Sequence, residues 1–246
     1  MDVTTLDYQS LQQRSKVAPC VLTLGFFDGV HRGHRRVIET ARLAARRSGL
    51  ALSVMTFDRH AASVFGGRPV RYLTTVAQKA ELMAQLGVDH LYVMRFTRDF
   101  AALTPQAFVT DCLVPLGAKQ VVAGFDYTFG RGGTTTAAAL PALAAGRFTT
   151  TVVPKLTASH LKISSTRIRE LIGRGEFAAA EALLGHPYQV VSPALQQLPP
   201  NGCYQAEDRF GRVVTVDVSA SGQLVSAGLG PLRFLRRTAQ LRVVGE

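Results

Sequence analysis

The first sixty residues contain a short apolar run, a glycine-bounded loop, an amphipathic segment and a second apolar run, in that order. The short apolar run at residues 21–24 contains no charged side chain and ends at Gly25, which is typical of a buried strand. Apolar residues then recur with helical spacing from Val37 to Ala45, and residues 48–49 end the pattern. Residues 50–56 are apolar again. A strand, a loop, a helix and a second strand predict a parallel α/β sheet.

The same alternation continues along the chain. Further strands are expected at residues 90–94, 119–123 and 147–153, and further helices at residues 76–86, 105–113, 168–172 and 177–184, with 135–145 helical in part. Thr104 is the expected N-cap of the helix that begins at Pro105. Right-handed crossovers between such strands give a doubly wound sheet, whose ligand crevice lies at the carboxyl ends of the strands.

The pattern changes after residue 187. Prolines and glycines interrupt the chain, and short alternating runs follow at residues 203–207, 213–218, 224–227 and 241–244. Such runs predict a few antiparallel strands. We therefore expect a nucleotide-binding domain over residues 1–187 and a small antiparallel β appendage over residues 188–246.

Composition limits the classes of function. The 246 residues are 47% hydrophobic and 18% charged, a globular mixture that excludes a wholly disordered chain. The net charge of +11 favours anionic partners such as nucleotides and phosphates. A nucleic-acid binder is not expected, because aromatic residues make up only 8%, the arginines are dispersed and no recognition motif is present.

Cysteine usage and hydropathy bear on location. Cys20, Cys112 and Cys203 are far apart and odd in number, so they predict neither a disulfide framework nor a zinc site and suit a reducing cytoplasm. The longest uncharged apolar run, residues 137–145, is too short to span a bilayer. The polar N-terminus has no secretion pattern. We expect a cytoplasmic protein that is not attached to a membrane.

The loop at residues 25–34, GFFDGVHRGH, joins the first strand to the first helix. Its glycines allow tight bends, and the helix start offers free N–H groups to a phosphate. His31 and His34 can both face that position and donate to phosphoryl oxygens, with added charge if protonated. Ordinary loop histidines, or half of a metal site, are the alternatives.

Two later segments carry further candidates. In residues 163–169, Ser164 or Ser165 can cap a helix, and the free N–H groups, the hydroxyls and Arg167 can bind an anion; a plain serine cap with a solvated arginine is the alternative. In residues 124–133, Asp126 follows the end of a strand, where it can accept from a ribose hydroxyl or an adenine amine. The nearby aromatic residues can line a flat ring or can belong to the core.

Six motifs, in order over residues 20–188, carry a family resemblance. They are GFFDGVHRGH (25–34), TFDRH (56–60), LTPQAF (103–108), VAGFDYTFG (122–130), ISSTRIR (163–169) and LGHPY (184–188). They resemble the GxFDGVHxGH, TFxPHP, LSPxxF, GxDFxFG, ISSTxIR and LLGRPY segments of prokaryotic FAD synthetases, the FMN adenylyltransferase domain of the bifunctional riboflavin kinase/FAD synthetase family. This family belongs to the HxGH nucleotidyltransferases, so the resemblance implies a Rossmann-like sheet.

The resemblance implies that the AMP group of ATP is transferred to FMN, giving FAD and pyrophosphate, with Mg²⁺ bridging phosphate oxygens through ligands that the sequence does not identify. The implied ATP-binding residues are Gly25, Phe27, Asp28, His31, Gly33, His34, Asp126, Ser164, Ser165, Thr166 and Arg167. The implied FMN-binding residues are Phe57, Arg59, His60, Phe125, Tyr127 and Phe129. Among them, His31, His34 and Arg167 are the expected catalytic residues, because they would stabilise the phosphate charge.

Two departures from the family pattern keep alternatives open. Arg59 and Ala61 replace both prolines of the PHP segment, which removes two rigid φ angles. A non-catalytic flavin or nucleotide sensor, and an adenylyltransferase for another phosphate acceptor, are the competing functions. Residues 198–204 resemble a strand of the family's riboflavin kinase barrel that lies beyond its catalytic motifs. We therefore expect a kinase remnant without riboflavin kinase activity.

Overall fold

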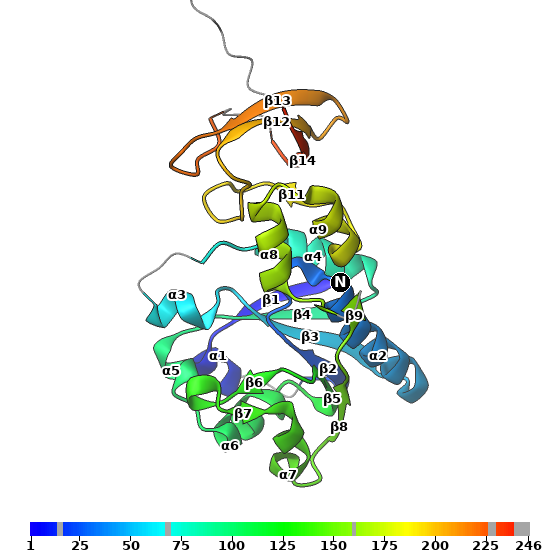
Figure 1. The fold of residues 1–246 in the computed structure, drawn as a ribbon. Helices are drawn as coiled ribbons and strands as arrows, with labels where there is room; N and C mark the ends of the chain where they lie inside the picture. Colours follow the sequence, from blue (N-terminus) through cyan, green and yellow to red (C-terminus); the bar gives the residue numbers. More distant parts are fainter. Residues whose placement is uncertain (14–16, 67–69, 159–160, 226–229, 239–246) are drawn as a thin grey trace, which may run out of the picture.

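The computed structural model describes residues 1–13, 17–66, 70–158, 161–225 and 230–238. Its centre is a six-stranded sheet in the order β1-β4-β3-β2-β5-β8, and every neighbouring pair is parallel. The strands are β1 (Asp2–Leu6), β2 (Cys20–Leu24), β3 (Ala51–Phe57), β4 (His90–Met94), β5 (Ala118–Gly124) and β8 (Thr149–Val153). The expected parallel α/β sheet is confirmed (Figure 1).

Helices cover both faces of this sheet, as a doubly wound fold requires. The helices are α1 (Tyr8–Gln12), α2 (Arg32–Ser48), α3 (Ala61–Phe65), α4 (Val76–Gln85), α5 (Arg98–Ala101), α6 (Pro105–Phe108), α7 (Leu140–Ala144), α8 (Ser165–Gly173) and α9 (Phe177–Leu184). Short helical turns occupy Asp28–Val30, Val109–Leu113, Arg131–Gly133 and Ala137–Ala139. Helix α2 ends where sequence predicts, at Gly49, whose φ of 66° suits glycine.

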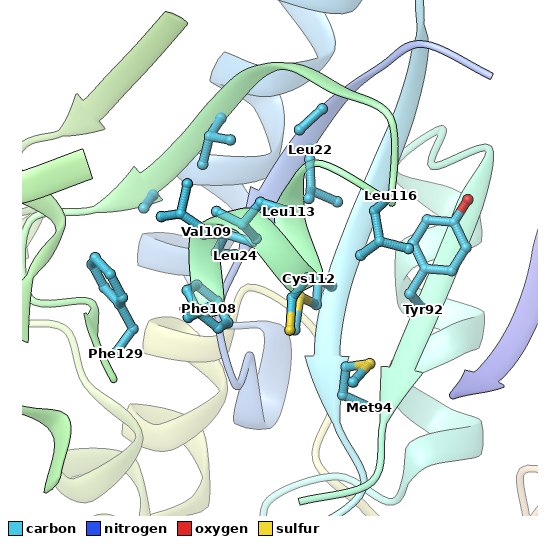
Figure 2. Packing of buried hydrophobic residues seen from close by; sticks show 14 of the residues in the cluster. Leu22, Leu24, Tyr92, Met94, Phe108, Val109, Cys112, Leu113, Leu116 and Phe129 are labelled. Carbon is cyan, nitrogen blue, oxygen red and sulfur yellow. The ribbon is translucent and has the colours of Figure 1, made fainter. Parts of the chain in front are cut away.

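Alternation along the strands separates two cores. Leu22 and Leu24 point to the face covered by the segment around Phe108 and Leu113, as Figure 2 shows. Val21 lies in the other core, which α2 covers. Successive side chains of a strand point to opposite faces, so a strand buried on both sides must be apolar throughout. This is why the central strands appear in the sequence as continuous apolar runs.

Three parts of the sheet and its helices differ from the sequence expectation. Strand β1 and helix α1 had no apolar signal, because β1 lies at the edge of the sheet and most of its residues are at least partly exposed. The helix expected over residues 105–113 is capped by Thr104 but changes at Val109 into a π-helical turn. There Val114 N–H donates to the carbonyl of Val109 at 3.1 Å, five residues back, which closes the wider turn.

The C-terminal part forms a separate antiparallel sheet in the order β11-β14-β12-β13. Its strands are β11 (Gln189–Val190), β12 (Gly202–Glu207), β13 (Val213–Val218) and β14 (Leu232–Arg237). Two small antiparallel pairs lie earlier in the chain: β6 (Thr128–Phe129) with β7 (Thr135–Thr136), and β9 (Thr157–Ala158) with β10 (Leu161–Lys162). The expected strands at 203–207 and 213–218 are confirmed. Leu224 bridges to Val218, whereas residues 226–227 and 241–244 lie outside the described residues.

One hydrophobic cluster joins this sheet to the helices that precede it. Ile172 and Phe177 of α8 and α9 pack with Tyr204 and Phe234 of the sheet. The rings of Phe177 and Phe234 are stacked with centroids 5.6 Å apart. The sheet therefore has no core of its own among the described residues, and it lies directly on α8 and α9 (Figure 1).

Substituting Phe234 by Ala removes a ring that is 2% exposed from this shared cluster. We expect a loss of stability of about 3–5 kcal/mol, the range for a large buried ring. Because α8 and α9 share the cluster, thermal unfolding followed by circular dichroism should shift as one transition. A separate early transition confined to the C-terminal sheet would contradict a shared core.

Candidate active site

A cleft of about 990 Å³ opens at the carboxyl ends of β2, β3 and β5. Its wall includes all but one of the site residues expected from the sequence. They are Gly25, Phe27, Asp28, His31, Gly33, His34, Phe57, Arg59, His60, Phe125, Asp126, Tyr127, Phe129, Ser164, Ser165 and Thr166. The exception is Arg167. The fold thus brings the histidine loop, the start of α8 and the aromatic segments to a single cavity.

The histidine loop follows a strained path into α2. Phe27 has a φ of 53° and Val30 a φ of 40°, both in the left-handed region that non-glycine residues rarely adopt. The loop ends at His31, whose Nδ1 accepts the backbone N–H of His34 at 3.2 Å and so caps α2. The two imidazole rings are stacked with centroids 3.5 Å apart.

Both imidazoles are neutral near pH 7. Burial lowers the pKa of His31 to about 4 and holds the pKa of His34 well below its ordinary value, and the stacked His31 ring also lowers the pKa of His34. Because Nδ1 of His31 accepts a hydrogen bond, the proton of the neutral ring lies on Nε2. His31 therefore acts as a neutral hydrogen-bond donor on the wall of the cleft. Nδ1 of His34 is buried and has no partner among the described residues.

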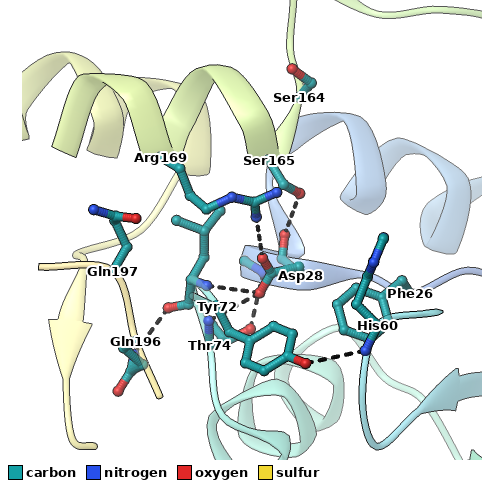
Figure 3. Close-up of polar contacts among 12 residues, drawn as sticks. Phe26, Asp28, His60, Tyr72, Thr74, Ser164, Ser165, Arg169, Gln196 and Gln197 are labelled. Atoms are coloured by element: carbon teal, nitrogen blue, oxygen red, sulfur yellow. Dashed lines mark hydrogen bonds and ion pairs between the residues drawn. The ribbon is translucent and has the colours of Figure 1, made fainter. Parts of the chain in front are cut away.

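Asp28 organises the loop from beneath (Figure 3). One carboxylate oxygen accepts the backbone N–H groups of Leu73 and Thr74 at 2.9 and 3.2 Å, and the other accepts from the Arg169 guanidinium at 2.6 Å. Burial raises the pKa of the Asp28 carboxyl, while Arg169 and the backbone donors lower it. Every contact donates to the side chain, so its surroundings satisfy the carboxylate form. Asp28 is thus already saturated with protein donors.

Helix α8 begins at the cleft. Ser164 caps it by accepting the backbone N–H of Arg167, which confirms the serine cap. The hydroxyl of Ser165 donates to the carbonyl of Asp28 at 2.9 Å, and Thr166 is exposed in the cleft wall. No acidic residue occupies the first turn, so the free N–H groups at the helix start can receive an anion.

The two arginines of this helix point in different directions. Arg169 lines the cleft and binds Asp28, although the sequence singled out Arg167. Arg167 is outside the cleft wall, and one of its guanidinium nitrogens is buried without a partner in the described part of the chain. The phosphate-binding role of Arg167 stays a prediction, and Arg169 is a cleft residue that the sequence reading did not identify.

The glycine-rich segment forms the opposite wall. Asp126 is half-exposed and pairs with Lys162, whose ammonium also lies 5.0 Å from the centre of the Phe125 ring. Phe125 is exposed, whereas Phe129 is buried in the core beneath the sheet. Phe125 is therefore free to contact a planar ligand, and Phe129 mainly supports the wall. Lys162 had no motif to mark it in the sequence.

The segment expected to bind the flavin also reaches the cleft. Phe57 is buried, and Arg59 is exposed and pairs with the adjacent Asp58 at 2.9 Å. His60 caps α3 and its ring meets the Phe26 ring edge-on at 5.3 Å. Burial lowers the pKa of His60, so this imidazole too is neutral near pH 7.

A buried lysine lies behind the loop. Lys79 of α4 is 2% exposed and donates to the carbonyl of Phe26 at 2.7 Å and to Thr56 Oγ1 at 3.0 Å. Burial lowers its pKa to about 8. No sequence signal pointed to Lys79, because a lysine in an amphipathic helix normally reaches solvent.

Comparison with known proteins identifies the family. The sequence profile described as FAD synthetase matches residues 13–167. The chain belongs to the FAD synthetase family. It is 51% identical over 170 residues to a bifunctional riboflavin kinase/FMN adenylyltransferase of Listeria monocytogenes, an alignment that covers 68% of this chain and 54% of that protein. The similar enzyme of Bacillus subtilis is 40% identical over 71% of this chain and 56% of its own length.

The chain spans about half the length of these two bifunctional relatives of the FAD synthetase family. A Listeria monocytogenes protein named FAD synthetase is 34% identical over 83% of this chain and 89% of its own length. A solved structure titled as a macrolide-efflux protein from Streptococcus pneumoniae superposes with a TM-score of 0.80 at 26% identity, covering 97% of this chain and 100% of its own. None of the helices in the described ranges has the length and hydropathy that a membrane span needs.

The depressed pKa of His31 makes stability depend on pH. The unfolded chain binds this proton at the ordinary pKa of 6.5, whereas the folded protein binds it at about 4. The free energy of unfolding that the neutral His31 contributes is therefore fully present above pH 6.5 and is lost as pH falls toward 4. Replacing His31 by Asn keeps a good N-cap that does not titrate. Between pH 7 and 5, this variant should lose about 2 kcal/mol less stability than the original protein in urea titrations. Equal losses in the two proteins would contradict the neutral, buried imidazole.

Proposed function

We propose that the protein is an FMN adenylyltransferase, which transfers AMP from ATP to FMN and releases pyrophosphate. The observation that carries the proposal is the meeting of a neutral histidine pair at the start of α2 with the serine-capped start of α8, in one cleft that also has an aromatic wall. Membership of the FAD synthetase family supports the same reaction.

In this reaction, a phosphate oxygen of FMN attacks the α-phosphorus of ATP. The new oxygen–phosphorus bond forms as the bond from the α-phosphorus to its bridging oxygen breaks, and pyrophosphate leaves with the electron pair. The attacking phosphate is already ionised near pH 7, so no strong general base is required. Catalysis depends on holding the two substrates in line and on stabilising charge on the phosphoryl oxygens.

The residues present suit those two tasks. We assign the phosphate oxygens of ATP to the Nε2–H of His31, to His34 and to the free N–H groups at the starts of α2 and α8. Ser164, Ser165, Thr166 and Arg167 remain the proposed ligands of the outer phosphates. Asp126, with its partner Lys162, would contact the adenosine part or the phosphate beside it.

The acceptor side is proposed to be the aromatic wall. Phe57, Tyr127 and Phe129 would support the isoalloxazine ring from the core, and Phe125 would contact it from the exposed side. Arg59 and His60 would face the FMN phosphate. This assignment takes the altered TFDRH segment as a flavin-binding loop in spite of its missing prolines.

Magnesium would enter with ATP. The described residues contain no group of three or more His, Cys, Asp or Glu side chains that could hold a metal ion. Mg²⁺ commonly keeps several waters and binds through substrate phosphates, so this donor set is compatible with a phosphate-held ion. Such an ion would neutralise charge on the leaving pyrophosphate. The three free cysteines fit the proposed cytoplasmic location.

The purified chain should convert ATP and FMN to FAD in the presence of Mg²⁺, as read by chromatography of the flavins, and should leave riboflavin unphosphorylated. FMN or ATP binding with no FAD formed would instead indicate a nucleotide sensor. Pyrophosphate release with another phosphate compound, and none with FMN, would indicate a different acceptor. Riboflavin phosphorylation would contradict the proposed absence of kinase activity.

Substituting His31 or His34 by Ala should lower the rate of FAD formation roughly tenfold to a thousandfold, because each substitution removes a donor or its stacked support from a charged transition state. The matched control is His90 to Ala. His90 lies at the amino end of β4, whereas the cleft lies at the carboxyl ends of the strands. Unchanged FAD formation after loss of both cleft histidines would refute their role.

A further inference from the structure

A segment of the C-terminal part runs beside the loop that holds Asp28. We name residues 192–197 the strap. The backbone N–H of Tyr72 donates to the carbonyl of Leu195, and the backbone N–H of Gln197 donates to the carbonyl of Tyr72, both at 2.8 Å. These two bonds form a parallel bridge between Tyr72 and Gln196. The strap therefore pairs with Tyr72 through the residues on either side of Gln196.

Gln196 fixes the strap in this place. Its side chain is fully buried, and its amide makes all four of its hydrogen bonds. Nε2 donates to the carbonyls of Leu73 and Gln189, and Oε1 accepts the backbone N–H groups of Val191 and Ser192. A buried amide satisfied in this way specifies one arrangement, since any shift leaves polar groups without partners.

The other edge of the same loop faces the cleft. The N–H groups of Leu73 and Thr74 bind Asp28, and Thr74 Oγ1 accepts the N–H of Gly29 at 3.0 Å. Tyr72 extends into the cleft wall, with its ring 5.8 Å from that of Phe26. Figure 3 shows Tyr72 between the strap residue Gln196 and the histidine at position 60.

The Tyr72 hydroxyl is available to a ligand. Its oxygen accepts the backbone N–H of His60 at 3.2 Å. Within the described ranges, its own proton has no acceptor, although a phenol that lines a cleft normally finds one. A donor in this position, beside the exposed start of α3, suits an oxygen atom of a ligand.

We propose that Tyr72 donates to an oxygen of the ribityl phosphate chain of FMN, and that Gln196 is the positioning residue that holds Tyr72 there. The inference rests on the proposed function for the identity of the ligand. It gives the C-terminal part a role in binding the acceptor. Tyr72→Phe keeps the N–H groups of Leu73 and Thr74 on Asp28 and keeps the cap and stacking of the histidine pair, so loss of the hydroxyl should affect FMN binding and leave turnover nearly unchanged.

The test compares Tyr72→Phe, Gln196→Ala and Gln197→Ala in the full chain, with FMN and ATP varied in turn. Gln197→Ala is the matched control, because its side chain donates only to the adjacent Leu198 carbonyl and its backbone bond to Tyr72 is kept. We expect the KM for FMN to rise about tenfold in the first two variants, the loss of roughly one hydrogen bond. In Tyr72→Phe, the KM for ATP and the kcat should change less than twofold, and in Gln197→Ala all three constants should change less than twofold.

The double variant Tyr72→Phe with Gln196→Ala separates positioning from general damage. If Gln196 acts through Tyr72, the KM for FMN in the double variant should be no higher than in the more affected single variant. The proposal would be overturned if the rise in the KM for FMN in the double variant equalled the product of the two single rises. An unchanged KM for FMN in Tyr72→Phe, or a fall in kcat alone, would also overturn it. Thermal denaturation checks folding, and if Gln196→Ala does not fold, Tyr72→Phe alone decides whether the hydroxyl binds FMN.

Failure of the proposed function gives a different result. If the original chain forms no FAD, quenching of FMN fluorescence still measures binding. A weaker binding by about tenfold in Tyr72→Phe would support the contact in a protein without turnover. Equal binding of FMN by the original chain and by Tyr72→Phe would overturn it.

Discussion

The buried carboxylate of Asp28 connects three segments that are far apart in the sequence: the histidine loop, residues 73–74 and helix α8. An ionised group removed from water costs several kcal/mol unless donors surround it. Arg169 and two backbone N–H groups provide those donors, and each comes from a different part of the fold from Asp28 itself. Burying this carboxylate at low cost therefore requires the histidine loop, residues 73–74 and α8 to come together.

Around this carboxylate, arginine and lysine side chains carry the positive charge, whereas the two histidines provide neutral hydrogen-bond donors. Several permanent cations line the cleft, and two of them, Arg169 and Lys162, have acidic partners across it in Asp28 and Asp126. The imidazoles of His31 and His34 are kept neutral by burial and provide directed donors instead. Pairing with Asp28 and Asp126 offsets the cost of holding the Arg169 and Lys162 cations in a partly buried wall.

The sequence predicted what depends on local pattern. The apolar period and the helix-end signals predicted the strand at 90–94, the cap at Thr104 and the helix that residues 25–34 lead into. It failed where tertiary surroundings decide. Residues two apart on a helix face different directions, so nothing local in ISSTRIR could say that the second arginine enters the cleft. The burial of Lys79 likewise depends on a strand and a loop remote from it in the chain.

The left-handed backbone at Val30 has a consequence for how ligands are received. A β-branched residue with a φ of 40° is strained by roughly 1–3 kcal/mol, and here its side chain is fully buried against α2 and the sheet. Burial of that side chain in a close-packed core opposes relaxation of the strained backbone. Packing consequently holds the loop in one backbone shape, so a ligand that binds there would not have to order it.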